Sequence, residues 1–126
     1  MMRILLVEDD PDDVFLARKA LDRTKLPYEL AHVWDGEEAL EWLAKNPQPD
    51  VVLLDINMPR LDGQETLKRI RAEPPLSELP VIMLTTSDAE RDVLAAFQNR
   101  ATAYYAKPLR WNEIGRIIQA SKGEAV

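Results

Sequence analysis

Cysteine is absent from the 126-residue chain, which excludes a disulfide scaffold, a thiolate metal site and a cysteine nucleophile. Long hydrophobic runs are also missing, because the longest stretch without Lys, Arg, Asp or Glu is residues 79–87. A helix that spans a bilayer needs roughly 20 apolar residues. The first residues also lack the apolar centre of a secretory signal. We therefore expect a cytoplasmic protein without a membrane anchor.

An excess of basic residues is missing as well. The chain has 16 Lys and Arg against 22 Asp and Glu, a formal net charge of −6. Proteins that bind a phosphate backbone normally present a basic face, so we expect no direct nucleic-acid binding. The remaining composition, 46% hydrophobic and 30% charged, is typical of a globular domain with its own core. We expect residues 1–126 to form one domain that no output domain follows.

Apolar runs rich in β-branched residues alternate with amphipathic segments along the whole chain. The predicted strands are Arg3–Val7, Tyr28–Val33, Asp50–Leu54, Pro80–Leu84 and Thr102–Tyr105. Apolar stripes at helical spacing lie between them, and two examples are Leu16, Ala17, Ala20 and Leu21, and then Val93, Leu94 and Phe97. Strict alternation of this kind predicts an α/β fold, with helices on both faces of a parallel sheet.

Capping signals precede four of the predicted helices. The capping residues are Asp10, Asp35, Asp62 and Ser87. Pro follows the first, and a Glu follows each of the others three residues later, as in a capping box. Asp12 and Asp13 are acids of a first helical turn, where the helix dipole favours negative charge. We therefore expect Asp10, Asp12 and Asp13 to be structural and to lie outside any functional site.

Polar side chains stand where the predicted strands end. They are Glu8 and Asp9 after the first strand, Asp55 after the third, Thr85 after the fourth and Lys107 after the fifth. Ligands of open α/β sheets bind outside the carboxyl ends of the strands. We therefore expect three carboxylates, one hydroxyl and one ammonium to meet at one edge of the sheet. His32 lies within the second strand, and we expect it to be structural.

Four ordered motifs carry a family resemblance: LLVEDD at 5–10, LLDINMP at 53–59 with Asp62-Gly63 following, MLTTS at 83–87 and YYAKP at 104–108. Together they resemble the receiver domain of two-component response regulators. More narrowly, the chain resembles stand-alone receivers that serve bacterial phytochrome-type kinases. The resemblance implies a flavodoxin-like (CheY-like), doubly wound five-stranded parallel sheet of order 2-1-3-4-5, flanked by five helices.

The resemblance also implies a phosphoacceptor site with a metal ion. Asp55 would be the nucleophile, and Mg²⁺ would bind Asp9, Asp55 and the backbone carbonyl of Asn57, with Glu8 acting mainly through water. The residues themselves favour the same chemistry. An Asp carboxylate can attack phosphorus, and clustered carboxylates suit a hard cation such as Mg²⁺.

Three further residues would respond to the phosphoryl group. The resemblance implies that Thr85 and Lys107 contact phosphoryl oxygens, that the Lys107–Pro108 peptide bond is cis, and that Tyr104 turns inward when Thr85 moves. Such a chain is not an enzyme, because it assists only its own phosphorylation and slow dephosphorylation.

The expected partners are a sensor histidine kinase, a bacterial phytochrome among them, and a downstream protein. A homodimer through the face of the fourth helix, fifth strand and fifth helix is a further expectation. The main alternative is a pseudo-receiver, an adaptor that binds partners without phosphorylation. Two others fit less well: an aspartate-nucleophile phosphohydrolase usually has Asp where this chain has Asn57, and a flavodoxin-like electron carrier needs a phosphate loop rich in Ser, Thr and Gly.

Overall fold

The computed structural model describes residues 1–58, 61–85 and 90–121. Its strands are β1 (Met2–Val7), β2 (Tyr28–Val33), β3 (Val51–Asp55), β4 (Val81–Thr85) and β5 (Ala103–Ala106). They form one parallel sheet of order β2-β1-β3-β4-β5. The predicted fold class and strand order are confirmed.

The predicted strand bounds differ from the observed ones by no more than one residue. Asp55 and Thr85 are the last residues of their strands, whereas the sequence placed them just beyond. The ladder continues because Ile56 N donates to Leu84 O at 3.0 Å and Lys107 N donates to Thr85 O at 2.7 Å. Both side chains therefore start from rigid, paired backbone.

The helices are α1 (Pro11–Arg23), α2 (Gly36–Lys45), α3 (Gly63–Ala72), α4 (Glu90–Gln98) and α5 (Ile114–Ser121), with 3₁₀ turns η1 (Pro74–Leu76) and η2 (Trp111–Glu113). The side chains of Asp10, Asp35 and Asp62 accept backbone N–H bonds at the starts of α1, α2 and α3, so these predicted caps are confirmed. The fourth predicted cap, Ser87, lies outside the described residues. Segment 73–80, between α3 and β4, contains η1, which Pro74 opens.

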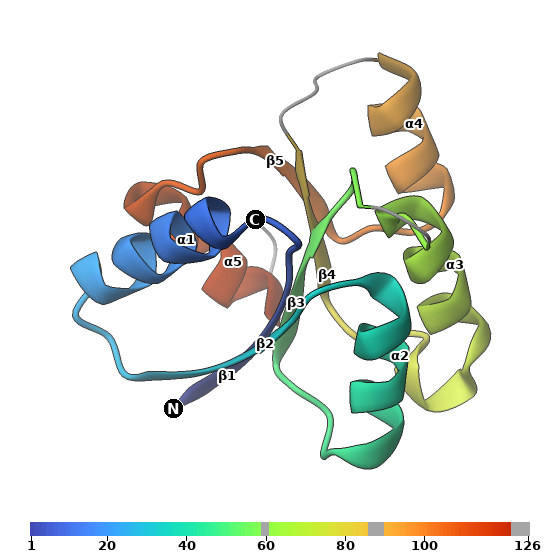
Figure 1. The fold of residues 1–126 in the computed structure, drawn as a ribbon, viewed down its shortest axis with the longest axis horizontal. Helices are drawn as coiled ribbons and strands as arrows, with labels where there is room; N and C mark the ends of the chain where they lie inside the picture. Colours follow the sequence, from blue (N-terminus) through green and yellow to red (C-terminus); the bar gives the residue numbers. More distant parts are fainter. Residues whose placement is uncertain (59–60, 86–89, 122–126) are drawn as a thin grey trace.

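Two cores lie on opposite faces of the sheet, and β3 and β4 are buried throughout. Residues of α2, α3 and α4 pack against one face, and residues of α1 and α5 pack against the other (Figure 1). Two of the predicted apolar helix stripes include residues that are not buried. Leu16 of α1 is exposed, and so are Leu94 and Phe97 of α4. The helices meet the sheet through Ala17, Ala20 and Leu21 on α1 and through Ala96 on the described part of α4.

Within the described residues, the structure contains no helix that combines the length and the apolar character needed to cross a membrane.

The start of α3 packs directly against the end of β3. A Cβ atom on Gly63 would lie 2.3 Å from the Asp55 carbonyl oxygen and 2.7 Å from the Ile56 Cα. Both neighbours are backbone atoms, so they cannot rotate away as a flexible side chain could. Gly63 N also donates to Ile56 O at 3.0 Å. Glycine at this position therefore allows α3 to support the strand that ends in Asp55.

Candidate functional site

Three carboxylates gather at the carboxyl edge of the sheet. Glu8 and Asp9 follow β1, Asp55 ends β3, and one carboxylate oxygen of each lies within 4.8 Å of the others. Glu8 and Asp55 are 1% and 2% exposed, while Asp9 is exposed to solvent. An all-oxygen set of this size fits a hard divalent cation, which binds carboxylates and keeps several waters. These residues could therefore hold a metal ion.

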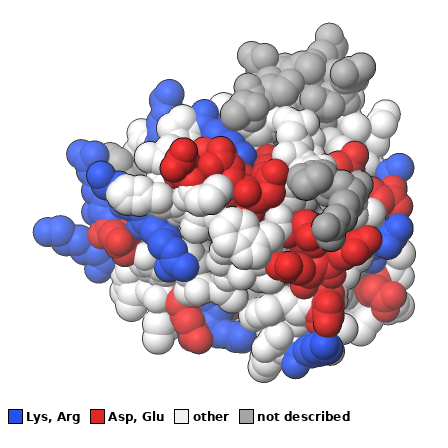
Figure 2. All heavy atoms as spheres, in the orientation of Figure 1, with Lys and Arg blue, Asp and Glu red and all other residues white. Residues whose placement is uncertain are grey.

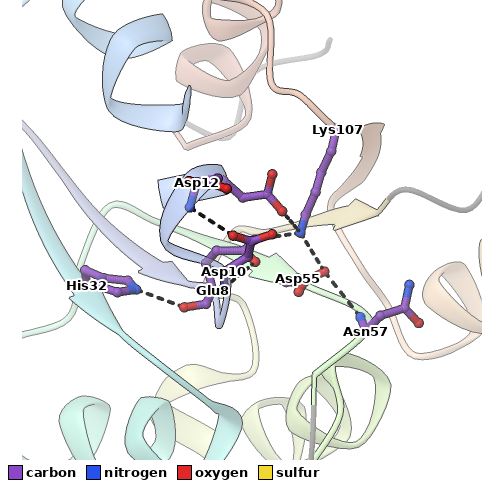
Figure 3. A network of polar contacts seen from close by, with 8 residues as sticks. Glu8, Asp10, Asp12, His32, Asp55, Asn57 and Lys107 are labelled. Atoms are coloured by element: carbon purple, nitrogen blue, oxygen red, sulfur yellow. Dashed lines mark hydrogen bonds and ion pairs between the residues drawn. The ribbon is translucent and has the colours of Figure 1, made fainter. Parts of the chain in front are cut away.

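The Lys107 ammonium lies among the carboxylates. Its Nζ atom is 2.7 Å from Glu8 Oε2 and 3.2 Å from Asp55 Oδ1. Figure 3 shows the Lys107 side chain ending between these two groups. The Lys107–Pro108 peptide bond is cis. The structure thus brings together four of the sequence-predicted site residues, namely Glu8, Asp9, Asp55 and Lys107.

Asp13 also belongs to this cluster, and the expectation that it lies outside the site is wrong. Its Oδ2 atom is 2.9 Å from Lys107 Nζ. The available signal was helical spacing. Asp13 precedes the buried Ala17 by four residues and Ala20 by seven, so it lies on the face of α1 that meets the sheet. Asp12, by contrast, is exposed.

The charges of the cluster shift one another's protonation. Burial, and then the neighbouring Asp55, raise the pKa of Glu8 to about 7 despite the opposing effect of Lys107. Burial also raises the pKa of Asp55. Burial lowers the pKa of Lys107, but hydrogen bonds to Glu8 and Asp13 and the charge of Asp55 outweigh it, so the net shift is upward. Lys107 therefore remains an ammonium ion.

The site is anionic when all of its groups are ionised. Four carboxylates, Glu8, Asp9, Asp13 and Asp55, face one ammonium, which leaves a formal charge of −3. Figure 2 shows carboxylates gathered near the N-terminal end of α1. An incoming cation is favoured there, and an incoming anion needs compensating charge.

Asn57 contacts Asp55, and Thr85 ends the neighbouring strand β4. Asn57 N donates to Asp55 Oδ1 at 3.3 Å, which keeps the Asn57 backbone beside the carboxylate. Thr85 is fully buried at the end of β4. Its side chain is on the same face of the sheet as Met83, two residues earlier.

The two tyrosines of β5 lie on opposite faces of the sheet. Tyr104 pairs in register with Met83 and packs against the core beneath α2, α3 and α4. Tyr105 packs against the core beneath α1 and α5. Because Thr85 pairs with Ala106 and shares the face of Met83, Tyr104 is the tyrosine on the Thr85 face.

His32 is structural, as expected, but it contacts the site. Its Nε2 atom lies 2.9 Å from the Glu8 carbonyl oxygen (Figure 3). A carbonyl oxygen only accepts, so Nε2 carries the proton. Glu8 N in turn donates to Val33 O at 3.1 Å. The end of β2 therefore holds both polar groups of the Glu8 backbone.

Comparison with known proteins points to one family. Residues 4–119 match the response regulator receiver domain. Response regulator Rcp1 of Synechocystis sp. is 34% identical over 122 residues, which cover 92% of this chain and 83% of Rcp1.

Solved structures of response regulators are also similar to this chain. The Mn²⁺-bound form of Rcp1 has a TM-score of 0.80 at 32% identity and covers 98% of this chain and 93% of its own. The bacteriophytochrome response regulator AtBRR has a TM-score of 0.86 at 34% identity, with coverage of 100% and 96%. The phosphorylated cyanobacterial phytochrome response regulator RcpA has a TM-score of 0.79 at 34% identity, with coverage of 94% and 89%.

Proposed function

Since the chain belongs to the response regulator receiver domain family, we propose that it accepts a phosphoryl group on Asp55 from a sensor histidine kinase and signals by a change of its own protein-binding surface. One observation carries the proposal. The Asp55 carboxylate lies 3.2 Å from the Lys107 ammonium, and one oxygen of each of two further carboxylates lies within 4.8 Å of it. A nucleophile, a fixed cation and a metal-binding set are thus in one place.

Glu8, Asp9 and Asp55, with the Asn57 carbonyl, would hold Mg²⁺. The acidic cluster and the Mn²⁺-bound form of Rcp1 support a divalent cation, and Mg²⁺ suits oxygen ligands that leave room for water and phosphate. When bound, Mg²⁺ supplies charge neutralisation for the phosphoryl oxygens.

The transfer itself requires little beyond positioning and charge. An Asp55 carboxylate oxygen attacks the phosphorus of a phosphohistidine on the kinase. The oxygen–phosphorus bond forms, the phosphorus–nitrogen bond breaks, and the imidazole keeps the electron pair. Lys107 neutralises charge on one phosphoryl oxygen, and the Thr85 hydroxyl donates to another. The chain carries the product on its own residue and is not an enzyme in the usual sense.

Thr85 and Tyr104 would convert phosphorylation into a surface change. They share one face of the sheet on neighbouring strands, so movement of Thr85 toward the phosphoryl group alters the space available to Tyr104. Leu94 and Phe97 on α4 are 53% and 52% exposed, which supports this side as the surface for a downstream protein or a second copy of the chain. The phytochrome-associated relatives favour a phytochrome-type kinase as the phosphoryl donor.

The proposal is tested with acetyl phosphate, a small phosphodonor, and Mg²⁺. Intact mass is measured before and after hydroxylamine, which cleaves acyl phosphates and spares phosphoserine and phosphothreonine. We expect one hydroxylamine-labile phosphoryl group on the wild type and on Asp12→Asn, and none on Asp55→Asn. A wild type that gains none, yet still binds its partners, would instead be a pseudo-receiver.

A further inference from the structure

Asp13 and Asp12 are neighbouring acids in the first turn of α1, and the helix dipole explains both equally well. Among the residues that the structure describes, only Asp13 has a second side-chain contact. Its Oδ2 atom is 2.9 Å from Lys107 Nζ, across a separation of 94 residues in sequence. The Asp13 side chain is 24% exposed, while that of Lys107 is 9% exposed, so the pair is partly shielded from water. A shielded charge pair of this kind is stronger than an ordinary surface pair.

Lys107 has three N–H donors, and each has a carboxylate acceptor. Two of these acceptors, on Glu8 and Asp55, belong to the proposed metal set and become engaged when the site is loaded. Asp13 lies outside that set. It is the remaining acceptor of Lys107 among the residues that the structure describes.

We infer that Asp13 is a positioning residue that holds the Lys107 ammonium over Asp55 while the phosphoryl group arrives. The inference rests on the proposed phosphorylation of Asp55. Within the described residues, the carboxylates that could hold a metal ion do not include Asp13, which acts through Lys107. Asp13 links the start of α1 to the segment that follows β5.

A double-mutant cycle tests this role. The rate of Asp55 phosphorylation by acetyl phosphate with Mg²⁺ is measured for wild type, Asp13→Asn, Lys107→Gln and the double variant. We expect Asp13→Asn to slow the reaction roughly fivefold in the wild-type background. In the Lys107→Gln background the same change has no effect, because there is no ammonium left to position. Asp12→Asn, the matched first-turn control, leaves the rate unchanged.

The position of Lys107 is also measured without phosphorylation. In a nitrogen-edited proton spectrum, a lysine ammonium held by three acceptors gives a signal that survives exchange with water. We expect the Lys107 signal in wild type and Asp12→Asn, its loss in Asp13→Asn and its return in Asp13→Glu. This signal does not depend on whether Asp55 accepts phosphate.

The inference is overturned if Asp13→Asn leaves the rate unchanged or raises it, if its loss of rate is equal in both backgrounds, or if the Lys107 signal persists in Asp13→Asn. A wild type that takes up no phosphate at all contradicts the proposed function instead. The ammonium signal then still decides whether Asp13 holds Lys107.

Discussion

Lys107 and Arg71 are cations at opposite ends of the strands with side chains largely shielded from water, and their hydrogen-bond partners differ in charge. Lys107 follows the carboxyl end of β5 and contacts three carboxylates. Arg71, at the end of α3, is 9% exposed and donates to the carbonyl oxygens of Arg100, Leu76 and Leu79, which precede β5 and β4. The carboxylates around Lys107 can change charge, whereas the carbonyl groups that accept hydrogen bonds from Arg71 cannot.

The difference separates the candidate functional site from a structural contact. Burial lowers the pKa of Arg71, and the positive charge of Arg100 adds to the effect, whereas the pKa of Lys107 is raised by its carboxylate partners. Arg71 fixes three segments of backbone, including Arg100 at a positive φ of 66°. Lys107 stands where incoming cations and anions can rearrange its partners.

Arg71→Met should have the largest effect on stability. Three carbonyl groups lose their buried donor, so we expect the free energy of unfolding to fall by about 2–4 kcal/mol. Arg69→Met on the same helix is the control, with an expected change within about 0.5 kcal/mol, because Arg69 is exposed and pairs with Glu65 only at 3.5 Å. Denaturant unfolding measures both. An Arg71→Met variant that stays folded but cannot be phosphorylated on Asp55 would contradict a purely structural role for Arg71.

Lys107→Met should destabilise the protein in a pH-dependent way. Without the ammonium, the buried carboxylates of Glu8 and Asp55 repel each other when ionised, and protonation relieves the repulsion. We expect a larger loss of unfolding free energy at about pH 8 than at about pH 5.5 in metal-free buffer. The loss of unfolding free energy caused by Arg71→Met should be equal at the two pH values. A pH-independent loss for Lys107→Met would contradict the comparison.

Glu8 should make the metal-free protein less stable as the pH rises. Its pKa is 4.5 in the unfolded chain and about 7 when folded, so between these values the folded state holds a proton that the unfolded state has lost. The stabilisation is complete below pH 4.5 and is lost as the pH rises through about 7. We expect Glu8→Gln to gain stability relative to wild type over this window. Glu41→Gln, at an exposed acid, should not reproduce the gain.

Mg²⁺ should stabilise the wild type by about 1.4 kcal/mol at a concentration tenfold above its Kd. The effect should weaken as the pH falls below about 7, because a proton on Glu8 competes with the cation. Thermal unfolding with and without Mg²⁺ measures it. Arg71→Met should keep the increment and Asp9→Asn should lose it. Equal increments in Asp9→Asn and wild type would show that the cation binds elsewhere.

The fold and most of the site could be predicted from the sequence, because both are encoded locally. β-branched runs, capping residues such as Asp35 and Asp62, and alternation of elements specify a parallel sheet. Parallel strands then bring their carboxyl ends to one edge, which is why Glu8, Asp55 and Lys107 meet as expected.

The features that could not be predicted from the sequence depend on tertiary contacts. Asp13 has a sufficient local explanation as a first-turn acid, and its partner lies 94 residues away. In the sequence, Arg71 has no feature that distinguishes it from other helical arginines. Its buried contacts depend on η1 and on the segment before β5, which pack against it in the folded chain. Leu94 and Phe97 follow a helical stripe, yet α4 meets the sheet through Ala96 instead. Local patterns show which residues could be buried, while packing decides which of them are.

Locating the modified residue tests the central claim most directly. The wild type is incubated with acetyl phosphate and Mg²⁺, reduced with borohydride, which converts an aspartyl phosphate to homoserine, and mapped by peptide mass spectrometry. Our account predicts homoserine at position 55 and nowhere else. Homoserine at another aspartate, or none in a sample whose intact mass shows a bound phosphoryl group, would contradict it.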